Sequence, residues 1–396
     1  MKIKNDLIEQ CYKKSIDLLK NNSTKYGILA SSKSVKATQR NYLSVFGRDA
    51  SICLLGMVAS KDKELIKTAK KSLLTLVKYQ ALNGQIPNYV KPEAGYIDFY
   101  YTGCIDATLW WLIAVQYFDK NVKQKTKLKE SLADNIEKAV HWLECHEHQK
   151  FFLVYQNEAS DWADIMPRSG YVLYSNALWY EVKKLYNLKN KDKTKKFFNY
   201  FFDPNSVIPK SLLKKDRRLD QFNKYIKRSK KESLYISYLD FARTGYDEDV
   251  LGNLLACLTD LAGKKKTKQI ADILIKKKSS ALYPVRASIT NIEPNSKEWR
   301  AYMERYELNM PDQYHNGGIW PFIGGFWCII LSHAGLEQRA REELHKLAYV
   351  NSINKWQFNE WFHGKNGKAM GMHGQSWNAA MFIMAYQFLK RKRLIM

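Results

Sequence analysis

Residues 156–170 read Gln-Asn-Glu-Ala-Ser-Asp-Trp-Ala-Asp-Ile-Met-Pro-Arg-Ser-Gly, and an apolar run with helical spacing, residues 171–186, follows directly. Acidic side chains are rarely buried in a protein core, and three of them beside a tryptophan suit a site that transfers protons. A capping loop, with Asp161 or Asp164 at the start of the helix, would explain part of the same pattern. The rest of the chain has to decide between these two interpretations.

The same order, a polar or aromatic loop and then an apolar helix, recurs along the chain. The spacing of apolar residues predicts about twelve helices, at residues 1–21, 52–59, 62–79, 104–118, 127–147, 170–186, 191–202, 249–261, 264–278, 317–333, 337–349 and 373–389. They fall into pairs in which one helix is more apolar and its neighbour more charged. An inner ring of buried helices inside an outer ring of amphipathic ones gives this alternation.

This pattern predicts an all-α toroid, with long loops gathered at one end. Few strand periods appear and strands do not alternate with helices, which argues against a Rossmann or TIM fold. We expect one domain over residues 1–396, with a basic, irregular flap at residues 203–235. Acids, indoles and glycines gather in the loops before the apolar helices, so a site is expected at the end of the ring where those loops meet.

The composition limits the class of protein. The chain has 396 residues, of which 45% are hydrophobic and 13% aromatic, so it can bury a large core. Its first residues lack an apolar signal core, and no run of eighteen apolar residues appears, so we expect a cytoplasmic protein without a membrane span. The six cysteines are scattered without close pairing, which indicates reduced thiols.

The formal net charge is +25, which could indicate a nucleic-acid partner. The lysines, however, are spread over many segments and alternate with apolar residues at helical spacing. This arrangement is typical of solvated outer helix faces, so a nucleic-acid function is not our prediction.

Five short motifs occur in order along residues 41–390. They are Phe46-Gly47-Arg48-Asp49, residues 161–170, Leu251-Gly252-Asn253-Leu254, the segment Tyr-His-Asn-Gly-Gly-Ile-Trp-Pro at 314–321, and Phe-Asn-Glu-Trp-Phe-His-Gly at 358–364, with Gly374-Gln375-Ser376-Trp377 after the last. With these motifs the chain resembles the (α/α)6-barrel glycoside hydrolases, a group that includes neutral/alkaline invertases, mannosylglycerate and glucosylglycerate hydrolases, and amylo-α-1,6-glucosidase-like proteins.

The resemblance implies roles for particular residues. The catalytic acid would be Asp164, four residues before Arg168, with Asp161 as the alternative, and the catalytic base would be Glu360. Arg48 and Asp49 would line the sugar subsite. Plant invertases have two arginines and no proline after the acid, whereas this chain has Ile-Met-Pro at 165–167, which weakens the case for sucrose as the substrate.

The chemistry of glycoside hydrolysis fits these residue types. One carboxylic acid must protonate the leaving oxygen while a second carboxylate activates water or attacks the sugar. Trp162, Ile165 and Met166 could form an apolar wall that raises the pKa of Asp164 and keeps it protonated. Arg168 would oppose this if it paired with Asp164, so we expect it to pair with another acid, such as Glu158.

Other side chains are candidates for binding the substrate. Asp106, at the start of an apolar helix, is either an N-cap or a ligand for sugar hydroxyls. Further candidates, with Arg48, Asp49 and Arg168, are Trp162, Tyr314, His315, Trp320, Trp361, Gln375 and Trp377. The histidines lack metal-ligand spacing, so neither a metal nor another cofactor is predicted.

The sequence therefore predicts a glycoside hydrolase that cleaves an α-glycosidic, most simply α-glucosidic, bond by a two-carboxylate inverting mechanism. Its partner would be a small saccharide or a glycan, and no oligomeric state is predicted. A sugar epimerase on the same barrel is one alternative, although such enzymes rely on paired histidines and acids dominate the loops here. A catalytically silent sugar-binding protein is the other.

Overall fold

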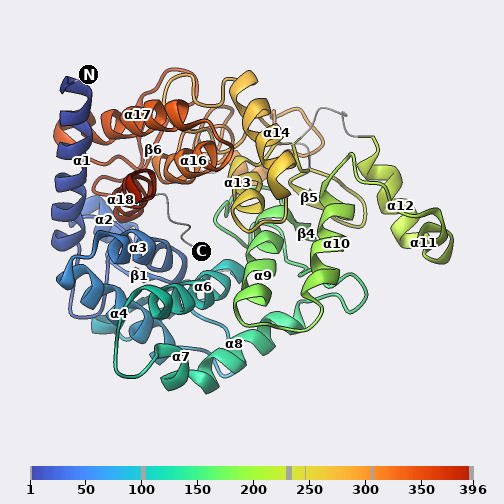
Figure 1. Cartoon of the computed structure of the whole chain (residues 1–396), viewed down its shortest axis with the longest axis horizontal. Helices are drawn as coiled ribbons and strands as arrows, with labels where there is room; N and C mark the ends of the chain where they lie inside the picture. The colour runs from blue at the N-terminus through green and yellow to red at the C-terminus, as the bar shows by residue number, and fades with distance from the viewer. Residues whose placement is uncertain (1, 100–103, 229–233, 246, 305–306, 392–396) are drawn as a thin grey trace.

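The structure is a computed structural model that describes residues 2–99, 104–228, 234–245, 247–304 and 307–391. Its inner helices form a closed ring in which each packs on the next and the last packs back on the first (Figure 1). They are α3 (Gly47–Ser60), α6 (Ile105–Asn121), α9 (Leu173–Leu185), α13 (Val250–Leu258), α16 (Pro321–His333) and α18 (Ser376–Arg391). This ring is the core of the molecule.

An outer helix packs against each inner one. The outer helices are α1 (Lys2–Asn21), α4 (Lys63–Lys78), α8 (Ala133–Cys145), α10 (Lys191–Phe202), α14 (Gly263–Lys276) and α17 (Glu337–Trp356). The two rings form the predicted toroid of paired helices.

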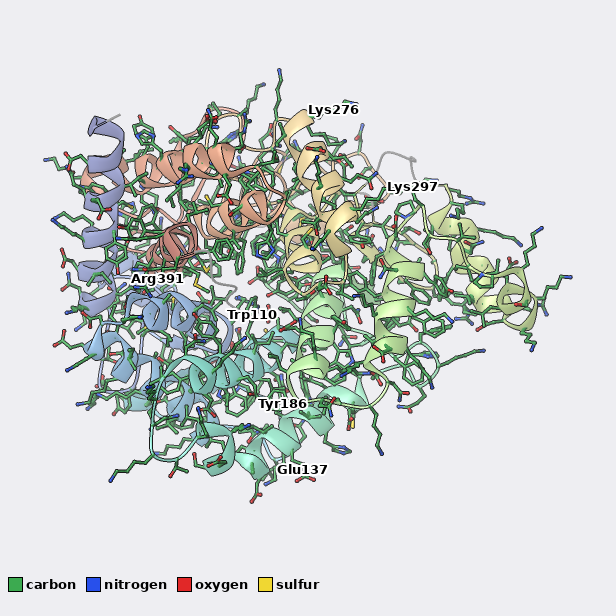
Figure 2. All side chains as sticks on the ribbon, viewed as in Figure 1. Trp110, Glu137, Tyr186, Lys276, Lys297 and Arg391 are labelled. Atoms are coloured by element: carbon green, nitrogen blue, oxygen red, sulfur yellow. The ribbon has the colours of Figure 1, made fainter. Side chains whose placement is uncertain are left out.

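Burial explains the difference between the two rings. Inner helices are covered on all sides, as in α16, where residues 321–332 are all buried. Outer helices bury one face only, and α4 does so with Leu65, Ala69, Leu73 and Leu76 at helical spacing. Figure 2 shows the same division in single residues, with Trp110 near the centre of the ring and Glu137 and Lys276 at its periphery.

Glycines allow the last inner helix, α18, to approach its neighbours α3 and α16 closely. A Cβ atom on Gly56 of α3 would run into the backbone carbonyl of Ala380 in α18, and one on Gly325 of α16 would meet the carbonyl of Met381 at 2.6 Å. Backbones pack this closely only where no side chain stands between them. These contacts close the ring where the two ends of the chain meet.

Short antiparallel strands shape the mouth of the ring. β1 (Val45–Phe46), β2 (Tyr89–Lys91) and β3 (Tyr96–Asp98) form one sheet, with the short helix η1 (Pro92–Ala94) between β2 and β3. β4 (Tyr171–Val172) pairs with β5 (Tyr238–Leu239), and β6 (Trp361–Phe362) pairs with β7 (Ala369–Met370). Because β1 and β4 lead directly into α3 and α9, the strands fix where these inner helices begin.

Several predicted boundaries are wrong. The segment before α3 contains a short helix, α2 (Val35–Gln39), and the helix expected at 127–147 is split into α7 (Leu128–Ser131) and α8. The helix expected from residue 317 begins at Pro321, because proline fits the first helical position, where its missing N–H is not needed. Another short helix, α15 (Ala301–Glu304), lies in the long connection before α16.

The expected irregular flap is also wrong in form. Residues 203–228 contain two helices, α11 (Lys210–Lys215) and α12 (Arg217–Ile226), which project from the ring beside α10 (Figure 1). The carboxylate of Asp216 caps α12 by accepting hydrogen bonds from the backbone N–H groups of Arg218 and Leu219. Phe222 packs on Phe201 of α10, so the apolar side of α12 is covered. Residues 229–233 of the expected flap lie outside the described residues.

The cysteines are free thiols, all of them buried except Cys145. Among the described helices, none has the length and apolar composition needed to cross a membrane.

Candidate active site

One cavity of about 330 Å³ opens among the loops that lead into α3, α16 and α18. It is lined by Arg40, Asn41, Tyr42, Phe46, Arg48, Asp49, Asn88, Tyr89, Tyr96, Asp98, Trp162, Asp164, Tyr314, His315, Trp320, Glu360 and Trp377. Residues from both ends of the chain therefore meet in one place, because α18 packs on α3.

Most of the predicted site residues lie on the wall of this cavity. The lining includes the candidates Arg48, Asp49, Trp162, Asp164, Tyr314, His315, Trp320, Glu360 and Trp377. The candidates that do not line it are Asp106, Arg168, Trp361 and Gln375.

The acidic stretch, residues 156–170, forms a loop whose two ends are hydrogen-bonded to each other. The backbones of Gln156 and Gly170 exchange two hydrogen bonds of 2.9 Å, and the N–H of Ile105 in α6 donates to the carbonyl of Ser160. Within the loop, Asp161 accepts from the N–H of Ala163 at 2.8 Å and from the side chain of Gln156 at 3.0 Å. Both oxygens of this buried carboxylate are engaged in holding the loop, and Asp164 is the acid that reaches the cavity.

Asp164 is poised to carry a proton near neutral pH. Its side chain is 34% exposed, and no hydrogen bond links its carboxyl to another described residue. Burial raises the pKa of Asp164 to about 7; Arg48 opposes this shift, and the nearby charges of Asp161, Asp106 and Glu360 add to it. The carboxyl is therefore partly protonated where an ordinary aspartate is fully ionised.

A neutral histidine stands beside this acid. The Nδ1 atom of His315 is 3.9 Å from Asp164 Oδ1, but burial and the charges of Arg168 and Arg48 lower the pKa of His315 well below its usual value. His315 therefore brings no positive charge to lower the pKa of Asp164. Its ring stacks on Trp320, with 5.3 Å between ring centres, and is steeply tilted to Trp162, with 4.8 Å between ring centres.

Glu360 is held in a different environment. It is 4% exposed and follows directly after Asn359 at the start of β6. One carboxylate oxygen accepts from the Tyr42 hydroxyl at 2.6 Å and the other from the Met372 N–H at 2.8 Å. Burial raises the pKa of Glu360, while both of these hydrogen bonds act to lower it. The two donors stabilise and orient the ionised carboxylate.

Arg48 and Asp49 occupy the first turn of α3. Arg48 donates to both oxygens of Asp106, at 3.1 and 3.3 Å, and its Nε lies 3.5 Å from Asp49 Oδ2. Asp106 also accepts from the Tyr174 hydroxyl, which in turn accepts from the Trp110 indole. Asp106 is thus fully buried behind Arg48 and orients it, instead of binding sugar hydroxyls as predicted.

Several buried polar atoms of the cavity make no hydrogen bond to a described residue. They are the indole N–H groups of Trp162 and Trp377, the Oδ2 atom of Asp49, the Nε atom of Arg48 and the Nδ1 atom of His315. Burial raises the pKa of Asp49 to about 6, so it remains mostly ionised at neutral pH. Buried polar atoms normally find a partner, so these groups are suited to bind the hydroxyls of a sugar.

Arg168 pairs with a different acid from the one predicted. Its guanidinium donates to Asp247 at 2.6 and 3.1 Å and lies 3.3 Å from Asp249, with all three side chains buried. Glu158, the expected partner, is partly exposed and binds Arg243 and Arg300. Arg168 therefore ties the acidic loop to the segment before α13.

The two remaining candidates lie behind the wall. Trp361 is buried, and its ring centre lies 5.7 Å from that of Tyr314. Gln375 is buried at the start of α18, where its backbone N–H donates to the carbonyl of Phe358. Trp361 thus packs against Tyr314, which lines the cavity, and Gln375 joins the start of α18 to the segment before β6.

Sequence reasoning missed part of the wall. Tyr42 and the aromatic residues of the β2–β3 hairpin line the cavity, although none of the sequence motifs includes them. Among the described residues, no three His, Cys, Asp or Glu side chains are grouped so that they could hold a metal ion.

A double ring of paired helices, with acids and indoles in a cavity at one mouth, defines the class of (α/α)6-barrel glycoside hydrolases. The sequence matches the amylo-alpha-1,6-glucosidase family over residues 14–384, and the chain therefore belongs to that family. The resemblance seen in the sequence and the predicted fold class are both confirmed.

Solved structures and curated relatives agree with this class. The fold is similar to that of a mannosylglycerate hydrolase from Thermus thermophilus in complex with Tris and D-glycerate, with a TM-score of 0.66, 14% identity, and coverage of 94% of this chain and 99% of that one. It is also similar to Hormoconis resinae glucoamylase, with a TM-score of 0.60, 11% identity, and coverage of 98% and 74%. The mitochondrial neutral/alkaline invertase 1 of Oryza sativa subsp. japonica is 28% identical over 147 residues, which are 35% of this chain and 22% of that protein. The match thus spans about a quarter of the length of such relatives.

The structural role of Arg168, which ties the acidic loop to the segment before α13, can be tested by measuring the free energy of unfolding. Replacing it by methionine leaves Asp247 and Asp249 buried without their cation, and we expect a loss of about 3–5 kcal/mol in the free energy of unfolding. The matched control is Lys224→Met, which breaks the exposed pair with Asp220 and should cost less than about 1 kcal/mol. Urea denaturation measures both, and equal losses would contradict this role.

Proposed function

We propose that this chain hydrolyses an α-glycosidic bond, with Asp164 as general acid and Glu360 as general base. The observation that carries the proposal is that both carboxyls line one cavity in different surroundings. Asp164 has its pKa raised to about 7 and no fixed hydrogen-bond donor among the described residues, whereas Glu360 accepts two hydrogen bonds that favour its ionised form. A pair of this kind is what glycoside hydrolysis requires.

The reaction follows from these states. Asp164 donates its proton to the glycosidic oxygen as the bond from that oxygen to the anomeric carbon breaks. Glu360 takes a proton from a water molecule, and the water oxygen attacks the anomeric carbon from the opposite face of the sugar. We propose that this single displacement inverts the anomeric configuration.

The sugar that is released would be held by the deeper part of the cavity. The Oδ2 atom of Asp49, which lies 3.5 Å from Arg48 Nε and makes no hydrogen bond to a described residue, and the indole N–H of Trp377 can bind hydroxyls. Trp377, stacked on Phe322 at 4.1 Å, presents an apolar surface as well. The family to which the chain belongs favours an α-glucosyl unit in this position.

The alternatives that the sequence left open have less support. Sugar epimerases on this barrel use paired histidines, and the described lining of the cavity contains His315 alone, in its neutral form. A silent sugar-binding protein has no need of an acid whose pKa is raised to about 7 beside an oriented carboxylate.

Substitution of the two carboxyls tests the assignment. Asp164→Asn and Glu360→Gln should each lower kcat on an α-glucoside by roughly 10²–10⁴-fold, because each change removes one proton-transfer step. Asp161→Asn is the matched control, since its Oδ1 can still accept from Ala163, and we expect a loss of less than about tenfold. Normal turnover by Asp164→Asn, with an inactive Asp161→Asn, would transfer the role of the acid to Asp161.

The dependence of activity on pH tests the two proton states. The rate should fall as the pH rises above about 7, because Asp164 is active when protonated. It should fall again at low pH as Glu360, whose pKa is raised above that of an ordinary glutamate, becomes protonated. The measurement is kcat/KM against pH.

With a dinitrophenyl α-glucoside, whose leaving group needs no proton, Asp164→Asn should lose the alkaline limb only. An alkaline limb that persists in this variant would contradict the role of Asp164.

A further inference from the structure

A buried asparagine, Asn309, lies between the loop that carries Asp164 and the segment that carries His315. It belongs to the connection between α15 and α16, and its side chain is fully buried. Its amide nitrogen donates to the backbone carbonyl of Ile165 at 2.8 Å, and its amide oxygen accepts from the backbone N–H of Asn316 at 3.0 Å. Ile165 directly follows Asp164, and Asn316 directly follows His315. One side chain thus joins the neighbours of two groups that line the cavity.

The segment on the far side of this amide is itself firmly held. The side chain of Asn316 exchanges two hydrogen bonds with the backbone of Ile292, at 2.7 and 2.8 Å, and it also donates to the backbone carbonyl of Asn309 at 3.2 Å. Asn316 is fully buried as well. Asn309 therefore connects the acidic loop to a segment that has its own anchors in the fold.

The backbone on both sides of Asp164 is fixed by such bonds. The N–H of Ala163 donates to the carboxylate of Asp161 at 2.8 Å, and the carbonyl of Ile165 accepts from Asn309. The carboxyl of Asp164 makes no hydrogen bond to a described residue, so no direct partner holds it in place. The position of this carboxyl consequently depends on the two residues that flank it.

Packing alone does not explain an amide at position 309. An apolar side chain of similar size would fill the same space, whereas a fully buried amide costs free energy unless its polar atoms are bonded. The amide of Asn309 makes three hydrogen bonds to described residues, and all of them go to residues 165, 166 and 316. Because an amide donates at one end and accepts at the other, these bonds also fix its orientation.

We propose that Asn309 is a positioning residue for the proposed general acid. By holding the carbonyl of Ile165 to the segment of His315, it keeps the carboxyl of Asp164 within reach of the glycosidic oxygen. Asn309 does not line the cavity, so it acts through the acid and not on the substrate. The inference rests on the proposed hydrolysis and adds a residue that the protonation step requires and that the attack of water does not.

The test uses two substrates that differ in their need for an acid. One is an α-glucosyl disaccharide, maltose or isomaltose, whose leaving alcohol must be protonated, and the other is the dinitrophenyl α-glucoside, whose leaving group needs no proton. Rates are measured at a pH below the pKa of Asp164, which is about 7, so that the acid is protonated. Asn309→Leu removes the hydrogen bonds and keeps most of the volume. It should lower kcat on the disaccharide by roughly 10–100-fold and leave kcat on the dinitrophenyl α-glucoside within about threefold.

Two further variants separate positioning from stability. In Asn309→Asp the carboxylate can still accept from the N–H of Asn316 but cannot donate to Ile165, so the same selective loss is expected, and this variant carries the test if Asn309→Leu does not fold. In the double variant of Asp164→Asn and Asn309→Leu, the disaccharide should be hydrolysed no more slowly than by Asp164→Asn alone, because an acid that is absent cannot be misplaced.

Asn199→Leu is the matched control. The amide of Asn199 also makes three hydrogen bonds, but it belongs to α10 in the outer ring, and its loss should leave both rates close to those of the wild type. Equal losses on the two substrates in the Asn309 variants, or losses that add to that of Asp164→Asn, would indicate a purely structural role and overturn the inference. Wild-type rates in the Asn309 variants would do the same. A wild type that hydrolyses neither substrate would contradict the proposed function itself, and the inference with it.

Discussion

The structure depends on the contact between α3 and α18, the inner helices nearest the two ends of the chain. Gly56 lets the two backbones touch, and a side chain at that position would collide with Ala380. This contact brings the segment that carries Tyr42 next to the one that carries Glu360, 318 residues apart in sequence, so that one can donate a hydrogen bond to the other. Without a closed ring, the motifs that make up the cavity would not meet.

Burial then sets the chemistry of the cavity. Both carboxyls lie in the cavity, where partial or full burial disfavours their ionised forms, but they have different neighbours. Glu360 receives two hydrogen bonds that oppose the effect of burial, whereas the described part of the chain offers Asp164 none and places a neutral His315 beside it. On our proposal, these surroundings suit Glu360 to accept a proton and Asp164 to donate one.

The alternation of apolar and amphipathic helices could be predicted from the sequence, because fully buried inner helices are apolar on every side and outer helices are apolar on one side only. Asp164 and Glu360 could be named because they stand in motifs that resemble a known family. The partners of Arg168 could not be predicted, since Asp247 and Asp249 are about eighty residues away and no local pattern links them to it. Asp106 occupies a position where capping, sugar binding and support of Arg48 all call for the same residue type.

The aromatic residues Phe46, Tyr89 and Tyr96 of the cavity wall could not be predicted for a different reason. Their arrangement depends on the register of β1, β2 and β3, and strands of two or three residues are too short to show a period in the sequence. Tyr42 lies in an irregular segment just before β1, where its proximity to Glu360 results from ring closure. Their place in the cavity is evident only in the folded structure, where the loops surround the mouth of the ring.

The central claim is that a water molecule, activated by Glu360, attacks the sugar while Asp164 protonates the leaving oxygen. Proton NMR during the first minutes of hydrolysis of an α-glucoside tests it most directly, because the anomeric signal reports which face was attacked before mutarotation mixes the products. The account predicts that the β-anomer appears first and that no glycosyl ester forms on the protein. An α-anomer appearing first, or a glycosyl group trapped on Glu360, would make this residue a nucleophile and contradict the mechanism.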